Sequence, residues 1–120
     1  MSNVADAATM LESALDAIEG VRRQPLGEPI QPPATVLGPP ALRWESPAIA
    51  PSDARFLVYA IEAANDRALE RLWDLVEVVV EVVDAVSPSA AVISAEPAVY
   101  ESGTTQLPCY EIVVEVALND

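Results

Sequence analysis

The stretch DARFLVYAIEAANDRALERLWDLVEVVVEVVDAV, residues 53–86, joins a strand pattern to a long helix pattern and decides the fold class. Its first part, Ala54–Ala63, is rich in β-branched and aromatic residues and largely apolar on both faces, which predicts a central strand covered on both sides. Asn65 is placed to cap a helix over Asp66–Val86, and Ser87-Pro88 is placed to end it. The valine-rich half of that helix also alternates like a strand, but the strongly helical residues before it favour a helix.

The helix pattern divides into three faces at about 100° per residue. An acidic face spans an arc of roughly 80° and consists of Asp66, Glu70, Asp74, Glu77, Glu81 and Asp84. A second face suits packing on a sheet and consists of Leu69, Leu72, Trp73, Val76, Val79, Val80 and Val83. A third, apolar flank extends beyond what one sheet contact needs and consists of Leu75, Val78, Val82 and Val86. We interpret Leu75, Val78 and Val82 as a subunit interface, against the alternative that surface valines occur there by chance.

The N-terminal part of the chain predicts one more helix and a proline-rich region. Apolar residues recur at three- and four-residue steps over about Asn3–Glu19, with Asn3 as the cap and Gly20 as the stop. Proline excludes long helices and strands from residues 24–53. We interpret this region as an edge strand flanked by ordered loops, and a flexible linker is the alternative. Its short extended pieces are Ala34–Leu37 and Ala41–Glu45.

The C-terminal part predicts two strands. Ala90–Ala95 suits a short strand, followed by a turn region through Pro97 and Gly103. Residues alternate strictly over Cys109–Leu118, with one apolar face and two carboxylates on the other. The apolar face should therefore pack on a core, and the other face should stay partly exposed to solvent.

These elements predict a single α+β domain over residues 1–120, with a mostly antiparallel sheet and helices packed on it. Its parts are an N-terminal helix (1–20), the proline-rich loop and edge-strand region (24–53), and a strand-helix-strand-strand core (54–118). The expected order is helix, strand, strand, helix, strand, strand.

Composition restricts the chemistry of this domain. The formal net charge is −13, from 19 acidic residues against six arginines, with no His and one Cys. Without clustered cations we expect no sequence-specific binding of nucleic acid. Without His and Lys there is no Ser-His-Asp triad, no His-based zinc site and no Schiff-base lysine. We therefore predict no enzyme activity, no cofactor and no metal site, and interpret the acidic helix face as solvated rather than as a divalent-metal site.

The residue types in the sequence also bear on the location of the protein and on its partner contacts. No apolar run approaches the roughly 20 residues of a membrane helix, and the acidic N-terminal residues do not suit a secretory signal. Arg43, Trp44 and Arg55 are candidate partner contacts, because Arg and Trp often anchor interfaces. For Trp44, a role as a cover over the sheet is an equal alternative. The lone Cys109, in an apolar strand pattern, suits a buried small hydrophobe rather than a reactive thiol.

Two segments together carry a family resemblance. VYESGTTQLPCYEIVVEVAL, residues 99–118, preceded by DARFLVYAIEAANDRALERLWDLVEVV, residues 53–79, resembles the tail terminator proteins of long-tailed bacteriophages, and most nearly those of phages of actinobacteria. The resemblance covers Thr35–Leu118 and agrees in the order of elements, without a diagnostic motif.

The resemblance implies a structural virion protein. Such subunits form a hexameric ring on the head-proximal end of the tail tube, stop its polymerisation and join the tail to the head. It implies contacts with the tail tube protein and a head-closure or connector protein, assembly in the host cytoplasm, and passage of DNA through the ring. A head-to-tail ring needs two different complementary patches on each subunit. The alternatives are another neck ring (a head-closure protein or connector adaptor) and a small cytoplasmic regulatory or ligand-binding α+β module.

Overall fold

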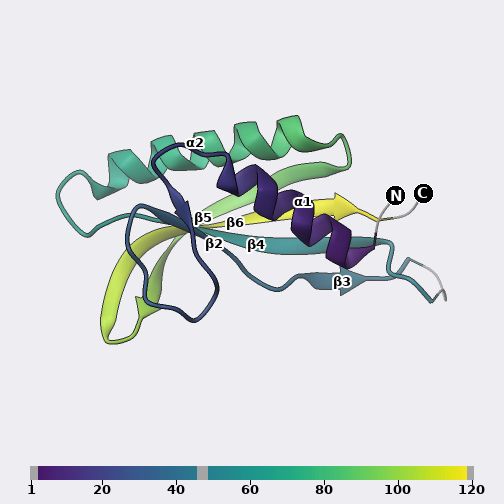
Figure 1. Ribbon diagram of the computed structural model, residues 1–120, viewed down its shortest axis with the longest axis horizontal. Coiled ribbons are helices and arrows are strands. Elements are labelled where there is room, and N and C mark those ends of the chain that lie inside the picture. Colours follow the sequence, from purple (N-terminus) through teal and green to yellow (C-terminus); the bar gives the residue numbers. More distant parts are fainter. Residues whose placement is uncertain (1–2, 46–48, 119–120) are drawn as a thin grey trace.

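The computed structural model describes residues 3–45 and 49–118, which form two helices and a six-stranded sheet (Figure 1). The fold class is α+β, as predicted. The elements in chain order are α1 (Val4–Asp16), β1 (Arg22–Arg23), β2 (Ala34–Leu37), β3 (Ala41–Arg43), β4 (Asp53–Ile61), α2 (Ala68–Val86), β5 (Ala90–Ser102) and β6 (Thr105–Ala117).

Strand β4 is the centre of the sheet, as its sequence predicts. The strand order is β1-β2-β4-β6-β5, and β3 pairs with β4 on the side away from β6. All neighbouring strands are antiparallel except β1 and β2. Four strands precede α2, where two were expected. Pro39 and Pro40 divide the predicted edge strand into β2 and β3, which pair with the two halves of β4.

The proline-rich region is ordered where the structure describes it, so the linker alternative is wrong there. The side-chain amide of Gln24 donates to the carbonyl of Pro29 at 2.9 Å and accepts from the backbone N–H of Gln31 at 2.8 Å. The backbone N–H of Ile30 donates to the hydroxyl of Ser102 at 2.9 Å. These contacts tie the loop between β1 and β2 to the hairpin of β5 and β6. Residues 46–48 lie outside the described residues.

Strands β5 and β6 form a long hairpin instead of the predicted short strand and turn region. β5 pairs with β6 from Ala90 to Ser102, and Gly103 supplies a positive φ of 62° at the turn. Pro97 stands inside β5, where it pairs with Tyr110. A proline is tolerated there because β5 is the outermost strand and its free edge has no ladder partner. The alternation predicted for the last strand is confirmed.

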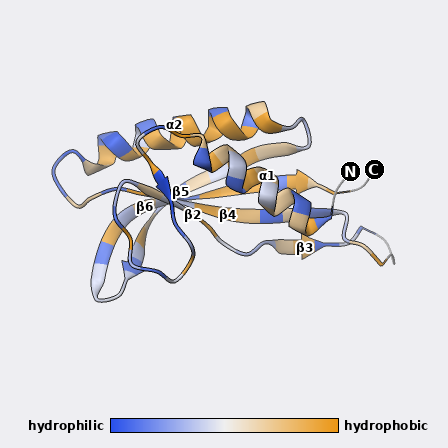
Figure 2. Cartoon of the chain, viewed as in Figure 1, coloured by the Kyte–Doolittle hydropathy of each residue, from blue (hydrophilic) through white to orange (hydrophobic). Residues whose placement is uncertain are grey.

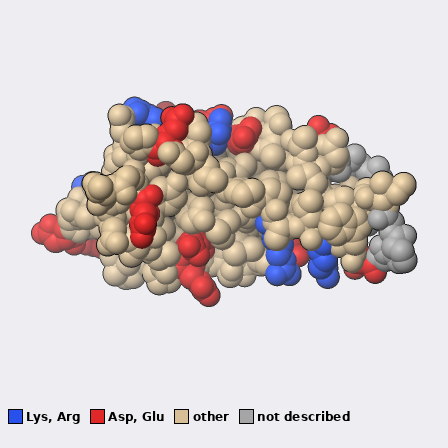
Figure 3. Space-filling model, turned by 90° about the horizontal axis from the view of Figure 1, so that it is seen from below, with Lys and Arg blue, Asp and Glu red and all other residues tan. Residues whose placement is uncertain are grey.

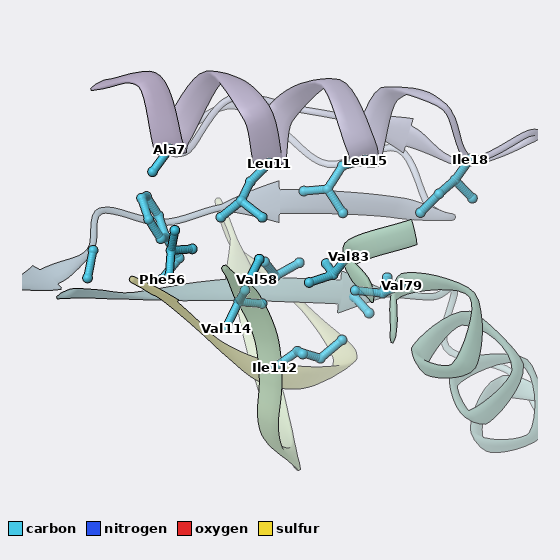
Figure 4. Packing of buried hydrophobic residues seen from close by; sticks show 14 of the residues in the cluster. Ala7, Leu11, Leu15, Ile18, Phe56, Val58, Val79, Val83, Ile112 and Val114 are labelled. Atoms are coloured by element: carbon cyan, nitrogen blue, oxygen red, sulfur yellow. The ribbon is translucent and has the colours of Figure 1, made fainter. Parts of the chain in front are cut away.

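Both helices pack on one face of the sheet, which makes a two-layer domain. Alternate residues of β4 and β6, among them Phe56 and Ile112, face the helices and are buried. Figure 4 shows the α1 side chains pointing toward these strands, with Val79 and Val83 of α2 beside them. The labelled residues of this segment are Ala7, Leu11 and Leu15 of α1 and Ile18, which follows the helix.

The prediction that β4 is covered on both sides is wrong. On the face away from the helices, Arg55 is exposed, and Leu57 and Tyr59 are half-buried. One end of this face carries a second cluster of buried residues, against which Ile30 of the proline-rich loop packs. Its buried members are Val36, Ile61, Leu107 and Cys109. The sequence of β4 is apolar on both faces, but residues 3–45 and 49–118 form no third helix to cover the second face.

Asn3 caps α1 as predicted, whereas the N-cap of α2 is Arg67 rather than Asn65 and makes no side-chain capping hydrogen bond. The side chain of Asn3 accepts from the backbone N–H of Asp6 at 2.9 Å, and α1 ends at Asp16, earlier than the expected Glu19. Asn65 accepts from the backbone N–H of Arg67 at 2.9 Å in the turn before α2. α2 is helical throughout its valine-rich half and ends at Val86, as predicted.

Candidate interaction surfaces

The flank of α2 predicted as a subunit interface lies inside the subunit. Leu75 is only 5% exposed and belongs to the core, and half-buried Val78 and Val82 pack against that core. Leu75 is therefore too deeply buried to form a subunit interface, whereas the assignment of half-buried Val78 and Val82 to an interface stays a prediction. α1 lies beside α2 on the same face of the sheet and is in contact with it. A helical pattern shows which residues share a side, but it does not show where a second helix will lie.

The opposite flank of α2 is exposed instead. Leu69 and Trp73 are each 50% exposed and Val80 is 37% exposed, although all three were expected to face the sheet. Edge strand β5, which is in contact with α2, exposes Ile93 at its bulge and Val99 near the hairpin end. Figure 2 shows hydrophobic residues recurring along the whole length of α2. We call Leu69, Trp73, Val80, Ile93 and Val99 the α2–β5 surface.

A hydrogen bond fixes the indole of Trp73 on this surface. Its Nε1–H donates to the phenol oxygen of Tyr110 on β6 at 2.9 Å. A tryptophan at a half-exposed site is held in one orientation when its N–H has a partner, while its ring face stays available for contact. The sequence contained one signal for this role, because Trp is enriched in interfaces, but the helical pattern assigned Trp73 to the core side.

The second exposed apolar group lies on the opposite edge of the sheet. Leu42 is 40% exposed, Trp44 is 47% exposed and Ile49 is fully exposed. We call these three residues the β3 surface. Trp44 donates from Nε1 to the carbonyl of Ile49 at 3.4 Å and lies outside the core, so its alternative role as a cover over the sheet is wrong.

The structure brings the predicted residues Arg43, Trp44 and Arg55 to this same edge. β3 pairs with β4 in a register that places Ala41 opposite Arg55. Both arginines have carboxylate partners within the subunit, because Arg43 binds Asp53 and Arg55 Nε lies 3.0 Å from Glu115 Oε2. The hydrogen bond from Arg43 lowers the pKa of Asp53, and the charge of Arg43 adds to that effect. Their charges are therefore compensated locally, and the apolar side chains beside them remain free for contact.

Nearly all of the exposed large hydrophobic side chains belong to these two surfaces. Of the large hydrophobic residues that are exposed within residues 3–45 and 49–118, every one except Leu26 belongs to the β3 surface or the α2–β5 surface. Figure 3 shows that uncharged residues cover most of the underside, with charged side chains in small groups mainly toward its edges. Exposed apolar groups that are gathered in this way indicate contact sites rather than scattered surface residues.

Few side chains among the described residues could act as nucleophiles or metal ligands. Cys109 is buried, and burial raises the pKa of its thiol to about 11, which confirms it as a buried small hydrophobe. Among the described residues, no three His, Cys, Asp or Glu side chains lie close enough together to hold a metal ion. Nor does either described helix combine the length and apolar character that a membrane crossing requires.

Compared with known proteins, the chain matches no protein family and no curated sequence.

Proposed function

We propose that this protein is a ring-forming structural subunit of a phage neck, namely the tail terminator that caps the tail tube, stops its polymerisation and joins tail to head. One observation supports this proposal above the others: the exposed apolar side chains gather on two unlike surfaces at opposite edges of one sheet. A closed head-to-tail ring requires two different complementary surfaces on each subunit. The β3 surface of one subunit would contact the α2–β5 surface of the next.

The charge of the chain is consistent with a ring around DNA. A formal net charge of −13 repels a nucleic-acid backbone, so a conduit built from these subunits would not retain the genome that passes through it. The proposed ring is a hexamer in the virion neck, assembled in the host cytoplasm. Its two axial faces would contact the tail tube protein and a head-closure or connector protein.

Electron microscopy of a lysate from phage unable to make this protein tests the proposal. A terminator defect should yield full heads lying apart from tails of irregular, excessive length. A plasmid copy of the wild-type gene should restore joined particles with tails of one length. Normal tails beside leaking heads would instead assign the protein to head closure, and intact infectious particles would exclude a neck role.

A further inference from the structure

A pocket of about 420 Å³ opens where the end of α1, the first half of α2 and the end of β4 meet. Its walls are partly apolar, formed by Ile18, Val21, Leu75 and Val78. Its charged lining consists of Glu19, Glu62, Arg71 and Asp74. No residue of the β3 surface or the α2–β5 surface lines it, so it is separate from the proposed ring contacts.

The distinctive feature of this pocket is the side chain of Glu62. Glu62 follows β4 directly, and its backbone N–H donates to the carbonyl of Pro108 at 3.2 Å, which fixes its position. The residue is only 7% exposed. Within residues 3–45 and 49–118, no hydrogen bond or ion pair reaches its carboxylate, although Arg71 lines the same pocket. Its carboxylate oxygens still reach solvent at the pocket, because among the described residues Thr35 Oγ1 is the one fully buried side-chain oxygen without a hydrogen-bond partner. A cationic ligand in the pocket can therefore pair with this carboxylate.

The lining determines which ligand chemistry fits. Three carboxylates against one guanidinium favour a cation and disfavour phosphate or carboxylate ligands. A bare metal ion does not suit the site, because no three acidic groups of the described residues converge. The apolar walls add a requirement for an aliphatic portion next to the charge. Arginine combines these features, since its stem packs on apolar surface while its planar guanidinium binds a carboxylate through two parallel hydrogen bonds.

We propose that this pocket binds an alkyl guanidinium group, namely the arginine side chain of a partner protein, with its charged head on Glu62 and its stem along Ile18 and Leu75. This assignment does not depend on the proposed neck function. Arg71 lines the same pocket and repels an incoming cation, so it lowers the affinity for the guanidinium group but does not prevent binding.

Titration of the 15N-labelled full chain with N-butylguanidinium, followed by NMR, tests the proposal. The wild-type protein should show saturable shifts that cluster at the pocket. Glu62→Gln should weaken binding about tenfold or more, because it keeps the shape and removes the charge. Arg71→Gln should tighten binding. Glu77→Gln, which removes an exposed acid of α2 outside the pocket, is the matched control and should leave the affinity unchanged.

Two further comparisons test whether the charge is needed and whether the group can come from a peptide side chain. N-butylurea has nearly the same shape without the charge and should not produce saturable shifts. A short flexible peptide with one central arginine should shift the same residues as N-butylguanidinium, and its lysine counterpart should bind more weakly. Binding of the free compound without the peptide would overturn the assignment to a partner's side chain. Equal affinity of wild type and Glu62→Gln, with both spectra showing a folded protein, would overturn the site.

Discussion

Trp44 is the residue at which the proposed ring contact is tested most cleanly, because its indole contributes little to the folded subunit. It is 47% exposed, and within the described part of the chain its indole makes one hydrogen bond, to the carbonyl of Ile49. Trp44→Ala should therefore lower the free energy of unfolding by less than about 1 kcal/mol. Covering the exposed half of the ring, on the order of 100 Å², contributes about 2.5 kcal/mol to a subunit contact. Its loss should raise the dissociation constant of that contact on the order of 50- to 100-fold.

Sedimentation velocity over a concentration series measures this change directly. Leu69→Gln perturbs the other surface, and Leu26→Gln is its matched control, because Leu26 and Leu69 are 54% and 50% exposed, respectively. We expect Trp44→Ala and Leu69→Gln to weaken association and Leu26→Gln to leave it unchanged. If assembly needs the tail as a template, the contact is tested by complementation instead, with each variant gene supplied to phage that lack the protein. The two surface variants should fail to restore the phage titre, and Leu26→Gln should restore it.

A mixture of the two surface variants distinguishes a head-to-tail contact from a symmetric one. Trp44→Ala keeps an intact α2–β5 surface and Leu69→Gln keeps an intact β3 surface, so one undamaged contact can form between unlike subunits. The mixture should therefore give heterodimers that do not grow into rings. Wild-type association of Trp44→Ala, or equal weakening by Leu26→Gln and Leu69→Gln, would refute the assignment of the two surfaces.

Three further predictions concern the subunit itself. Thr35→Val should raise the free energy of unfolding by about 1 kcal/mol in urea denaturation, because the Thr35 hydroxyl is buried without a hydrogen-bond partner among the described residues; a loss of stability would show that the hydroxyl has a partner. Cys109 should resist thiol reagents at pH 8 until urea unfolds the protein, since a pKa of about 11 leaves roughly one thiol in a thousand ionised there; rapid labelling of the native protein would contradict this burial. Arg43 lowers the pKa of Asp53, so their pair stabilises the fold at neutral pH and that contribution disappears as the pH falls through the lowered pKa. Arg43→Gln should flatten this part of the curve in thermal melts between neutral pH and about pH 3, and an unchanged curve would count against the pair.

The sequence predicts the parts of the fold that depend on local pattern. The alternation in β6 identified a strand with one apolar face, the apolar run in β4 identified a central strand, and the cap at Asn3 located the start of α1. Asn65 lies two residues before the observed N-cap of α2, Arg67. These features follow from the period of the side chains and from backbone capping, which neighbouring residues determine.

The parts that were missed depend on distant neighbours. Whether Leu75 or Leu69 faces inward depends on where α1 lies in space, and four strands separate α1 from α2 along the chain. Likewise, Pro97 suggested a turn because proline is rare in strands, whereas its position on an outermost strand removes the objection. For the candidate surfaces, Trp44 is exposed enough for the predicted partner contact, whereas the exposed apolar residues of α2 lie on another flank than the one that the helical pattern suggested.

Electrostatics restrict how copies of this chain can associate. Four of its arginines already bind carboxylates within the subunit, namely Arg23, Arg43, Arg55 and Arg67. Identical subunits with a net charge of −13 repel one another, and few uncommitted cations remain to offset that repulsion across an interface. A contact between copies must therefore draw its free energy from apolar burial at the β3 and α2–β5 surfaces. Such a balance disfavours association in dilute solution, so under the proposed function a ring would form where a tail tube already holds the subunits side by side.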